Sequence, residues 1–274
     1  MSLHQAIILA VVQGLTEFLP ISSSAHLALA PWLLGWKDQG LTFDIALHVG
    51  TLAAVLLYFG KSWLQIAAQG FGIRWGPDPQ LRQTPKLLWY LALASIPVGI
   101  AGFLLKDEAE QWRDPFLIGS MLVGVGILMG IADRLGSRRK QLGQVSFADS
   151  IVVGAAQALA IVPGTSRSGI TITAAVFRDI DRAAAARFSF LLSTPAIAGA
   201  AAKAFYDLHK AGGIPPDMRV MFAAGVLVSA ITGIAVIEIL LRYLSRHSLR
   251  LFVYYRIVFG IMVIALALFR RPAG

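Results

Sequence analysis

The fold is decided by one stretch of sequence, Gln13-Gly-Leu-Thr-Glu17-Phe-Leu-Pro20-Ile-Ser22-Ser23-Ser24-Ala-His26, which is polar and lies between two apolar segments. Pro20 has no backbone N–H, so it ends the helix that runs into it. The serines that follow are good N-cap residues for a second helix. Ionisable groups are costly inside a membrane, which makes Glu17 and His26 functional candidates. We predict a helical hairpin, broken at Pro20, that lines a cavity.

The composition is that of an integral membrane protein. The chain has 274 residues, of which 57% are hydrophobic and 14% charged, whereas soluble domains carry about 25% charged residues. The net charge of +9 therefore indicates basic cytoplasmic loops rather than a nucleic-acid partner. The chain contains no cysteine, which excludes thiol chemistry and disulfides. The first residues lack a positive segment and a cleavage site, so we expect no cleaved signal peptide.

Apolar runs of about 20 residues predict transmembrane helices, and two shorter, interrupted runs predict re-entrant hairpins. The predicted spans are 42–60, 87–105, 115–132, 188–202 with its flanks, 218–241 and 251–269. The predicted hairpins are 5–35, broken at Pro20, and 147–180, broken at Pro163-Gly-Thr-Ser-Arg-Ser-Gly169. We expect loops at 61–86 and at the acidic segment 106–114. Gly126 and Gly130 have the spacing that permits close helix contact, within one chain or across a homodimer.

An internal repeat relates the two hairpins. Phe18-Leu-Pro20-Ile-Ser-Ser-Ser24 aligns with Ile161-Val-Pro163-Gly-Thr-Ser-Arg167. The repeats are 1–135 and 147–274, each with one hairpin and three spans. Because three is odd, the halves must be inverted in the membrane, and a site is expected where they meet. The predicted fold is an all-α polytopic integral membrane protein with six transmembrane helices and two re-entrant hairpins.

The basic residues predict the orientation. The loops 61–86, 133–146, 178–187 and 242–250 would share one side and carry 14 of the 24 lysines and arginines. The opposite side carries eight, including Lys106 and Arg271, and Arg167 and Arg256 are left for the interior. Positive charge favours the cytoplasmic side, so both termini are expected outside.

Two hairpin breaks that meet would form one polar cluster in the membrane. Its members would be Gln13, Glu17, Ser22, Ser23, Ser24 and His26 from the first break, and Thr165, Ser166, Arg167 and Ser168 from the second. Arg167 offers a planar fork of donors that suits phosphate. The serines, Thr165 and the helix N-termini add neutral donors for an anion.

The same cluster contains groups that can react. Glu17 and the amide oxygen of Gln13 are hard ligands that suit Mg²⁺ or Ca²⁺. His26 can transfer a proton near neutral pH, and Ser23 or a water molecule can attack phosphorus. These groups predict phosphoryl transfer, which depends on positioning and charge. The surrounding lipid indicates a substrate with an apolar tail.

The motifs Gln13–His26 and Pro163–Gly169 resemble the two signature motifs of the undecaprenyl-diphosphate phosphatase family, the bacitracin-resistance type. The resemblance covers nearly the whole chain. It implies hydrolysis of the terminal phosphate of a polyprenyl diphosphate, the lipid carrier for peptidoglycan, with Mg²⁺ or Ca²⁺. It also implies the bacterial inner membrane, with an active site that opens to the periplasmic face.

The resemblance also implies residue roles. Glu17 matches the second acidic position of the family, Ser23 its essential serine, His26 its histidine and Arg167 its diphosphate-binding arginine. Gln13 departs from the pattern, because many members have glutamate there, and one negative charge is therefore missing. Asp44 and His48 match no motif residue. The alternative hypothesis is a lipid-phosphate transporter, since inverted repeats with broken helices also build transporters.

Overall fold

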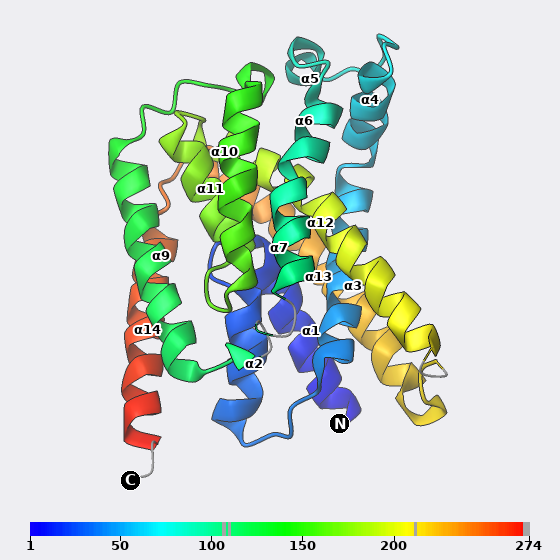
Figure 1. Cartoon of the computed structure of the whole chain (residues 1–274), viewed down its shortest axis with the longest axis vertical. Helices are drawn as coiled ribbons and strands as arrows, with labels where there is room; N and C mark the ends of the chain where they lie inside the picture. Colours follow the sequence, from blue (N-terminus) through cyan, green and yellow to red (C-terminus); the bar gives the residue numbers. More distant parts are fainter. Residues whose placement is uncertain (106–107, 109–110, 211–212, 271–274) are drawn as a thin grey trace.

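The computed structural model describes residues 1–105, 108, 111–210 and 213–270, and every element named in them is a helix (Figure 1). Five segments of this part of the chain are long and apolar enough to cross a membrane, and a bent pair of helices makes up to six. The five are α6 with α7 (Leu87–Ala94, Ile96–Leu104), α9 (Pro115–Leu135), α12 (Arg182–Lys210), α13 (Arg219–Leu244) and α14 (Arg250–Arg270). The bent pair is α3 (Leu41–Tyr58) and α4 (Gly60–Gly70), which meet at 73°. The prediction of a multi-pass helical membrane protein is confirmed.

The segment 61–86 differs from its prediction. It contains α4 and the short α5 (Pro79–Gln83), so the expectation of a loop is wrong for most of it. The reason is local packing: Ile66 is buried, and the Gln65 side chain exchanges two hydrogen bonds with the backbone of Asp78 (2.9 and 3.0 Å). Of the predicted acidic loop 106–114, residues 106, 107, 109 and 110 lie outside the described part, as does Arg271.

Each predicted hairpin consists of two short helices. The first contains α1 (Leu3–Phe18) and α2 (Ser23–Leu34). The second contains α10 (Phe147–Ala158), the 3-10 turn η2 (Leu159–Ile161) and α11 (Arg167–Phe177). α1 and the continuous segment of α10 and η2 are apolar but too short to count as membrane-spanning helices.

The two hairpins use the same capping residues. Ser2 and Ser146 open α1 and α10 with reciprocal side-chain and backbone hydrogen bonds, an arrangement that satisfies free N–H groups at a helix start. Ser22 and Ser166 cap α2 and α11, and both have positive φ angles (78° and 68°). The caps therefore pair Ser22 with Ser166, one residue away from the prediction, which aligned Ser22 with Thr165.

Small residues let the long helices approach closely. Gly126 of α9 faces Arg256 and Ile257 of α14, and a Cβ atom there would lie 3.1 Å from the Arg256 Cβ. Gly119 of α9 faces Gly260 and Ile264 in the same way. The glycine spacing that allowed either an internal contact or a homodimer thus serves an internal contact between α9 and α14.

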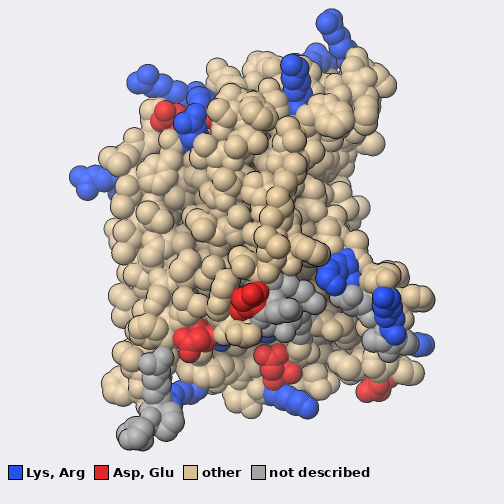
Figure 2. Space-filling model, in the orientation of Figure 1, with Lys and Arg blue, Asp and Glu red and all other residues tan. Residues whose placement is uncertain are grey.

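Ion pairs join several loops at one end of the molecule. Asp149, which is fully buried, binds Lys140 (3.0 Å) and Arg178 (2.8 Å). Arg187 of α12 binds Asp78 (2.6 Å), and Thr84 donates to the carbonyl of Gly143 (2.6 Å). Figure 2 shows mainly lysine and arginine side chains, with one acidic patch among them, along the upper end of the molecule, whereas several acidic and basic side chains mix at the lower end.

Candidate active site

The two hairpin turns meet at an ion pair between Glu17 and Arg167. Glu17 is the next-to-last residue of α1, and Arg167 is the first residue of α11. Arg167 Nη2 donates to Glu17 Oε1. The side chains are 5% and 15% exposed, so the pair lies inside the protein. Sequence reasoning expected these residues to share one site, and the structure brings them into direct contact.

Three further side chains surround the second oxygen of Glu17. Ser23 Oγ donates to Glu17 Oε2 (2.5 Å), and Gln13 Nε2 donates to the same atom (3.0 Å). His48 of α3 places its Nε2 atom 3.5 Å from Oε2. Ser23 follows the cap Ser22, so the break at Pro20 turns its hydroxyl back toward Glu17. The carboxylate therefore lies at the centre of the cluster.

The remaining predicted residues shape the two turns. Ser22 and Ser24 contact each other through their hydroxyls (3.2 Å), as do Ser166 and Ser168 (3.3 Å). Ser168 also donates to the backbone carbonyls of Glu17 and Leu19, at 3.2 and 3.1 Å. Ser168 thus fastens the start of α11 to the end of α1.

Several buried polar atoms near the pair have no partner within the described residues. They include Gln13 Oε1, Thr165 Oγ1 and Arg167 Nη1, and both polar side-chain atoms of Gln157, on α10 of the second hairpin, are unpaired as well. Buried polar atoms normally form hydrogen bonds, so a group of unpaired ones at one place indicates where a ligand binds. The set contains a guanidinium donor and a hydroxyl, which suit phosphate oxygens, and an amide oxygen, which suits a cation.

Arg256 of α14 forms hydrogen bonds with the backbone of both hairpin turns. It is fully buried. Its guanidinium donates to Pro20 O (3.2 Å) in the first turn and to Gly164 O (2.9 Å) and Thr165 O (3.0 Å) in the second. In the described part of the chain, it has no carboxylate at ion-pair distance. Sequence reasoning left Arg256 in the interior without a role, because no local pattern reveals which carbonyls a distant arginine reaches.

His26 is oriented toward α14. Its Nδ1 lies 2.7 Å from the carbonyl of Ser22, so Nδ1 is the donor. Its Nε2 lies 2.7 Å from the Tyr255 hydroxyl, and its ring stacks on Phe259. Both ring nitrogens thus have partners other than Glu17 and Ser23. Tyr255 was missed by sequence reasoning, since it lies 229 positions away in the chain.

The carboxylate of Asp44 and the imidazole of His48 contact different side chains in the structure. The Asp44 carboxylate binds Gln39 (2.6 Å) and Arg113 (2.8 Å), which makes it a structural contact. His48, four residues later on the same face of α3, reaches Glu17 instead. The spacing of Asp44 and His48 in the sequence indicates that they share one face of a helix, but it does not indicate that His48 lies next to Glu17.

The residues present fit a divalent cation in part. In the described part of the chain, no group of three or more histidine, cysteine, aspartate or glutamate side chains is arranged to hold a metal. Glu17 nevertheless lies beside the Gln13 amide, whose nitrogen donates to it and whose oxygen is unpaired. Mg²⁺ commonly binds one or two carboxylates and takes its other ligands from substrate phosphates and water. A donor set of one carboxylate and one amide oxygen is compatible with that pattern.

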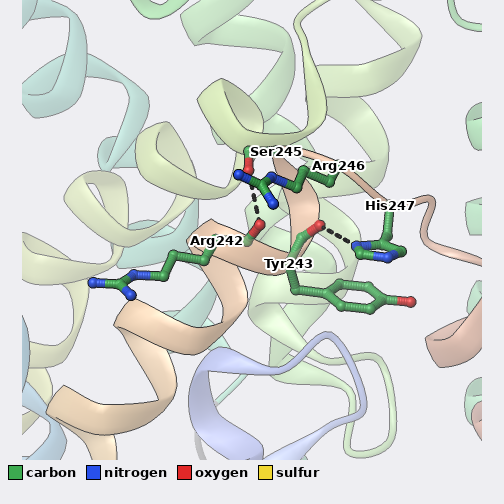
Figure 3. Close-up of a pocket in the computed structure, with 5 residues that line it drawn as sticks. All are labelled: Arg242, Tyr243, Ser245, Arg246 and His247. Carbon is green, nitrogen blue, oxygen red and sulfur yellow. Dashed lines mark hydrogen bonds between the residues drawn. The ribbon is translucent and has the colours of Figure 1, made fainter.

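A separate hollow lies at the turn between α13 and α14 (Figure 3). It is lined by Arg242, Tyr243, Ser245, Arg246 and His247. Ser245 Oγ donates to the carbonyl of Arg242 (2.7 Å), and the His247 ring stacks on Tyr243. None of these residues belongs to the two motifs, so this hollow is distinct from the site at Glu17.

The fold and the site define a multi-pass membrane protein with a buried carboxylate–guanidinium pair where two helix N-termini meet. The chain belongs to the family described as bacitracin resistance protein BacA, whose profile matches residues 6–262. A relative from Desulforudis audaxviator, named undecaprenyl-diphosphatase, is 45% identical over 98% of this chain and 100% of its own. A relative of the same name from Moorella thermoacetica is 47% identical over 99% of this chain and 100% of its own.

Proposed function

We propose that the chain hydrolyses undecaprenyl diphosphate to undecaprenyl phosphate and inorganic phosphate at the Glu17–Arg167 site. The relatives carry the name of this activity over the full length of the chain. The reaction resupplies the lipid carrier for peptidoglycan synthesis and gives bacitracin resistance. The observation that carries the assignment of the site is the convergence of a carboxylate, a guanidinium and two serine-capped helix N-termini at one buried place.

The diphosphate is held by donors from both turns. Arg167 has a free Nη1 and Thr165 a free hydroxyl, and the N-termini of α2 and α11 attract negative charge. Ser22, Ser24, Ser166 and Ser168 position those backbone N–H groups through their caps and hydroxyl contacts. The apolar tail remains in lipid, so the headgroup is bound without extraction of the whole substrate from the membrane.

Glu17 and Gln13 hold the divalent cation, Mg²⁺ or Ca²⁺, in this proposal. When bound, such a cation neutralises charge on the diphosphate and stabilises the transition state. Glu17 also orients Ser23, whose hydroxyl already donates to it at 2.5 Å. Arg167 keeps the Glu17 carboxylate in place through its Nη2 atom, and its unpaired Nη1 atom is left to bind a phosphate oxygen of the substrate.

Two routes lead from this arrangement to the products. In one, Ser23 Oγ attacks the terminal phosphorus, its proton passes to Glu17, and the bridging P–O bond breaks to release undecaprenyl phosphate. Water then hydrolyses the phosphoserine. In the other, Glu17 takes a proton from a water molecule whose oxygen attacks the terminal phosphorus, and the same bridging P–O bond breaks to release undecaprenyl phosphate and inorganic phosphate. His26 supplies a proton to the leaving phosphate in either route, which requires its Nε2 to exchange the Tyr255 hydroxyl for the substrate. In Ser23→Ala, loss of activity by a factor of about 10³ or more supports the serine route, and a smaller loss supports the water route.

The hairpins and spans form two inverted repeats in this proposal, 1–135 and 147–274. The shared serine caps support it, as does the same separation between Gln13 and Gln157 as between Ser22 and Ser166. In Figure 1 the first hairpin starts at the lower end and the second at the upper end. We place the basic upper end in the cytoplasm of a bacterial inner membrane, so that the active site opens to the periplasmic face.

The lack of cysteine allows a direct test of orientation. Arg246→Cys and Asp217→Cys each introduce one thiol into a chain that has none. In intact cells whose outer membrane has been permeabilised, a membrane-impermeant maleimide should label the thiol at position 217 but not at position 246. Labelling of 246 without 217 contradicts the orientation.

The activity is tested by phosphate release from purified protein in detergent with undecaprenyl diphosphate. Phosphate release that is lost when Glu17 or Arg167 is substituted supports the proposed site. Normal release from a protein with one of these substitutions removes the substituted residue from the site. A pure transporter releases no phosphate. The transporter hypothesis has no support from the relatives, which are named as diphosphatases.

A further inference from the structure

His48 contacts the active-site carboxylate although no motif contains it. Its Nδ1 lies 2.7 Å from the backbone carbonyl of Asp44. A carbonyl can only accept, so Nδ1 carries the hydrogen, and in the neutral ring Nε2 has a free lone pair. That lone pair faces Glu17 Oε2 at 3.5 Å. In the neutral form of the ring, two electron-rich atoms thus face each other, and either a proton on Nε2 or a metal cation bound to both atoms makes the contact favourable.

The distances around Glu17 Oε2 match those between neighbouring ligands of one metal ion. Ligands about 2.1 Å from a metal lie about 3 Å apart at right angles and about 3.5 Å apart at wider angles. The Gln13 amide is 3.0 Å and His48 Nε2 is 3.5 Å from this oxygen. Rotation of the Gln13 amide by half a turn exchanges its nitrogen for its oxygen, which at present is buried without a partner.

The hydrogen bond from Nδ1 to a backbone carbonyl is itself typical of a metal-binding histidine. Such a bond fixes the ring orientation and the tautomer, and it makes the other nitrogen a better ligand. His48 is also partly exposed, with 29% of its side chain accessible, so an ion and its water ligands can reach it. By contrast, both nitrogens of His26 are already occupied.

We propose that His48 Nε2 is a third protein ligand of the divalent cation, beside Glu17 and the amide oxygen of Gln13. This inference rests on the cation site of the proposed function. Imidazole suits first-row transition metals better than Ca²⁺. The site should therefore bind Mn²⁺ or Co²⁺ more tightly than Ca²⁺. The histidine nitrogen adds a neutral ligand beside Gln13 and leaves the charge of the site unchanged.

The test uses Mn²⁺ alone with the full-length protein in detergent. Electron spin echo envelope modulation of Mn²⁺ bound to the wild type should show a ¹⁴N nucleus directly bound to the metal. Protein from cells grown on ¹⁵N-histidine should give a changed signal. In His48→Gln the signal should disappear, and the Mn²⁺ affinity should fall at least about tenfold, while the Ca²⁺ affinity changes less. His247→Gln, at the distant turn between α13 and α14, is the matched control and should behave as wild type.

The outcomes separate this inference from the proposed function, because the signal requires no hydrolysis. Mn²⁺ bound to wild type without a nitrogen signal overturns the inference, even where phosphate release is normal. A signal that persists in folded His48→Gln and His48→Asn also overturns it, since another histidine must then be the ligand. A nitrogen signal lost in both variants supports it, even in a protein that releases no phosphate.

Discussion

Ser23 and Arg167 occupy equivalent places in the two hairpins, each directly after an N-cap serine with positive φ, and both contact the carboxylate of Glu17. The first hairpin contributes a hydroxyl at this place and the second a guanidinium. A repeated backbone turn thus carries two different chemical groups. The site is asymmetric although the two turns share a cap geometry, and Glu17 connects the two groups.

The carboxylate of Glu17 should be essential for activity. Glu17→Gln keeps the size of the side chain but removes the charge that binds Arg167 and accepts from Ser23. We expect phosphate release to fall by a factor of about 10² or more, measured as kcat/KM at saturating Mg²⁺. Glu238→Gln removes a carboxylate that binds Tyr58 and Arg242 outside the site, and it should retain activity. Equal kcat/KM values for Glu17→Gln and Glu238→Gln would contradict the proposed role of Glu17.

The planar fork of Arg167 should matter beyond its charge. In Arg167→Lys one ammonium replaces two terminal donors, so the side chain cannot hold both Glu17 and a phosphate oxygen. We expect kcat/KM to fall about 100-fold and KM to rise. Arg246→Lys, at the hollow in Figure 3, is the matched control. A lysine variant with normal KM would mean that charge alone is sufficient.

Arg256 should contribute to the stability of the folded protein. Arg256→Met leaves buried carbonyls of both turns without donors, and each unsatisfied buried group costs about 1–3 kcal/mol. We expect the variant to lose at least about 3 kcal/mol of stability, seen as a lower thermal midpoint in detergent. Arg270→Met removes an exposed arginine that packs on Trp32 and should leave the midpoint nearly unchanged. If the two midpoints agree, the bonds of Arg256 contribute little.

Two glycines of α9 offer a paired test of helix packing. A Cβ atom at Gly119 would lie 2.7 Å from Ile264 Cγ1 and 2.9 Å from Gly260 O, whereas a Cβ at Gly124 meets nothing within 4 Å. Gly119→Ala should therefore lower the thermal midpoint, with a cost of about 1–3 kcal/mol, and Gly124→Ala should not. The reverse order of midpoints would show that α9 and α14 are not packed as described.

The ion pair of Asp78 and Arg187 should make stability depend on pH. Burial raises the pKa of Asp78, but the hydrogen bond and charge of Arg187 and two backbone N–H groups lower it more, so the pKa lies below its ordinary value of 3.8. A lowered carboxyl pKa stabilises the folded state above the unfolded pKa, and this contribution is lost as pH falls. Asp78→Asn should thus be less stable than wild type at pH 7, with a difference that shrinks below about pH 4.

The matched carboxylate for this experiment is Asp217, which is exposed at the start of η3 (Pro216–Met218). Asp217→Asn should have the thermal midpoint of wild type at both pH values. A difference between wild type and Asp78→Asn that stays constant from pH 7 to pH 3 would show that the carboxylate charge does not contribute.

Much of the site could be predicted because it depends on short-range rules. Pro20 and the serines after it determine where α1 ends and α2 begins, and Pro163–Gly169 does the same for the second hairpin. Polar residues in an apolar chain then identify which side chains belong together. The contact between Glu17 and Arg167 follows from those rules once the two turns meet.

The rest could not be predicted because it depends on contacts between distant segments. His48 has the same local surroundings as any polar residue on a membrane helix, and only the packing of α3 beside α1 brings it to Glu17. Arg256 and Tyr255 depend on the position of α14 in the same way. The helix α4 was missed because its composition is less apolar than that of a membrane span.

The buried guanidinium of Arg256 also affects which headgroups can enter. It brings a second positive charge close to a site whose other arginine is already neutralised by Glu17. Among the described residues at the two turns, Arg167 is paired with Glu17 and Arg256 with no carboxylate, which leaves an excess of one positive charge there before substrate and cation bind. An anionic headgroup relieves that excess, whereas a zwitterionic phospholipid, abundant in the surrounding bilayer, does so poorly. This electrostatic difference favours an anionic headgroup over a zwitterionic one at the two turns.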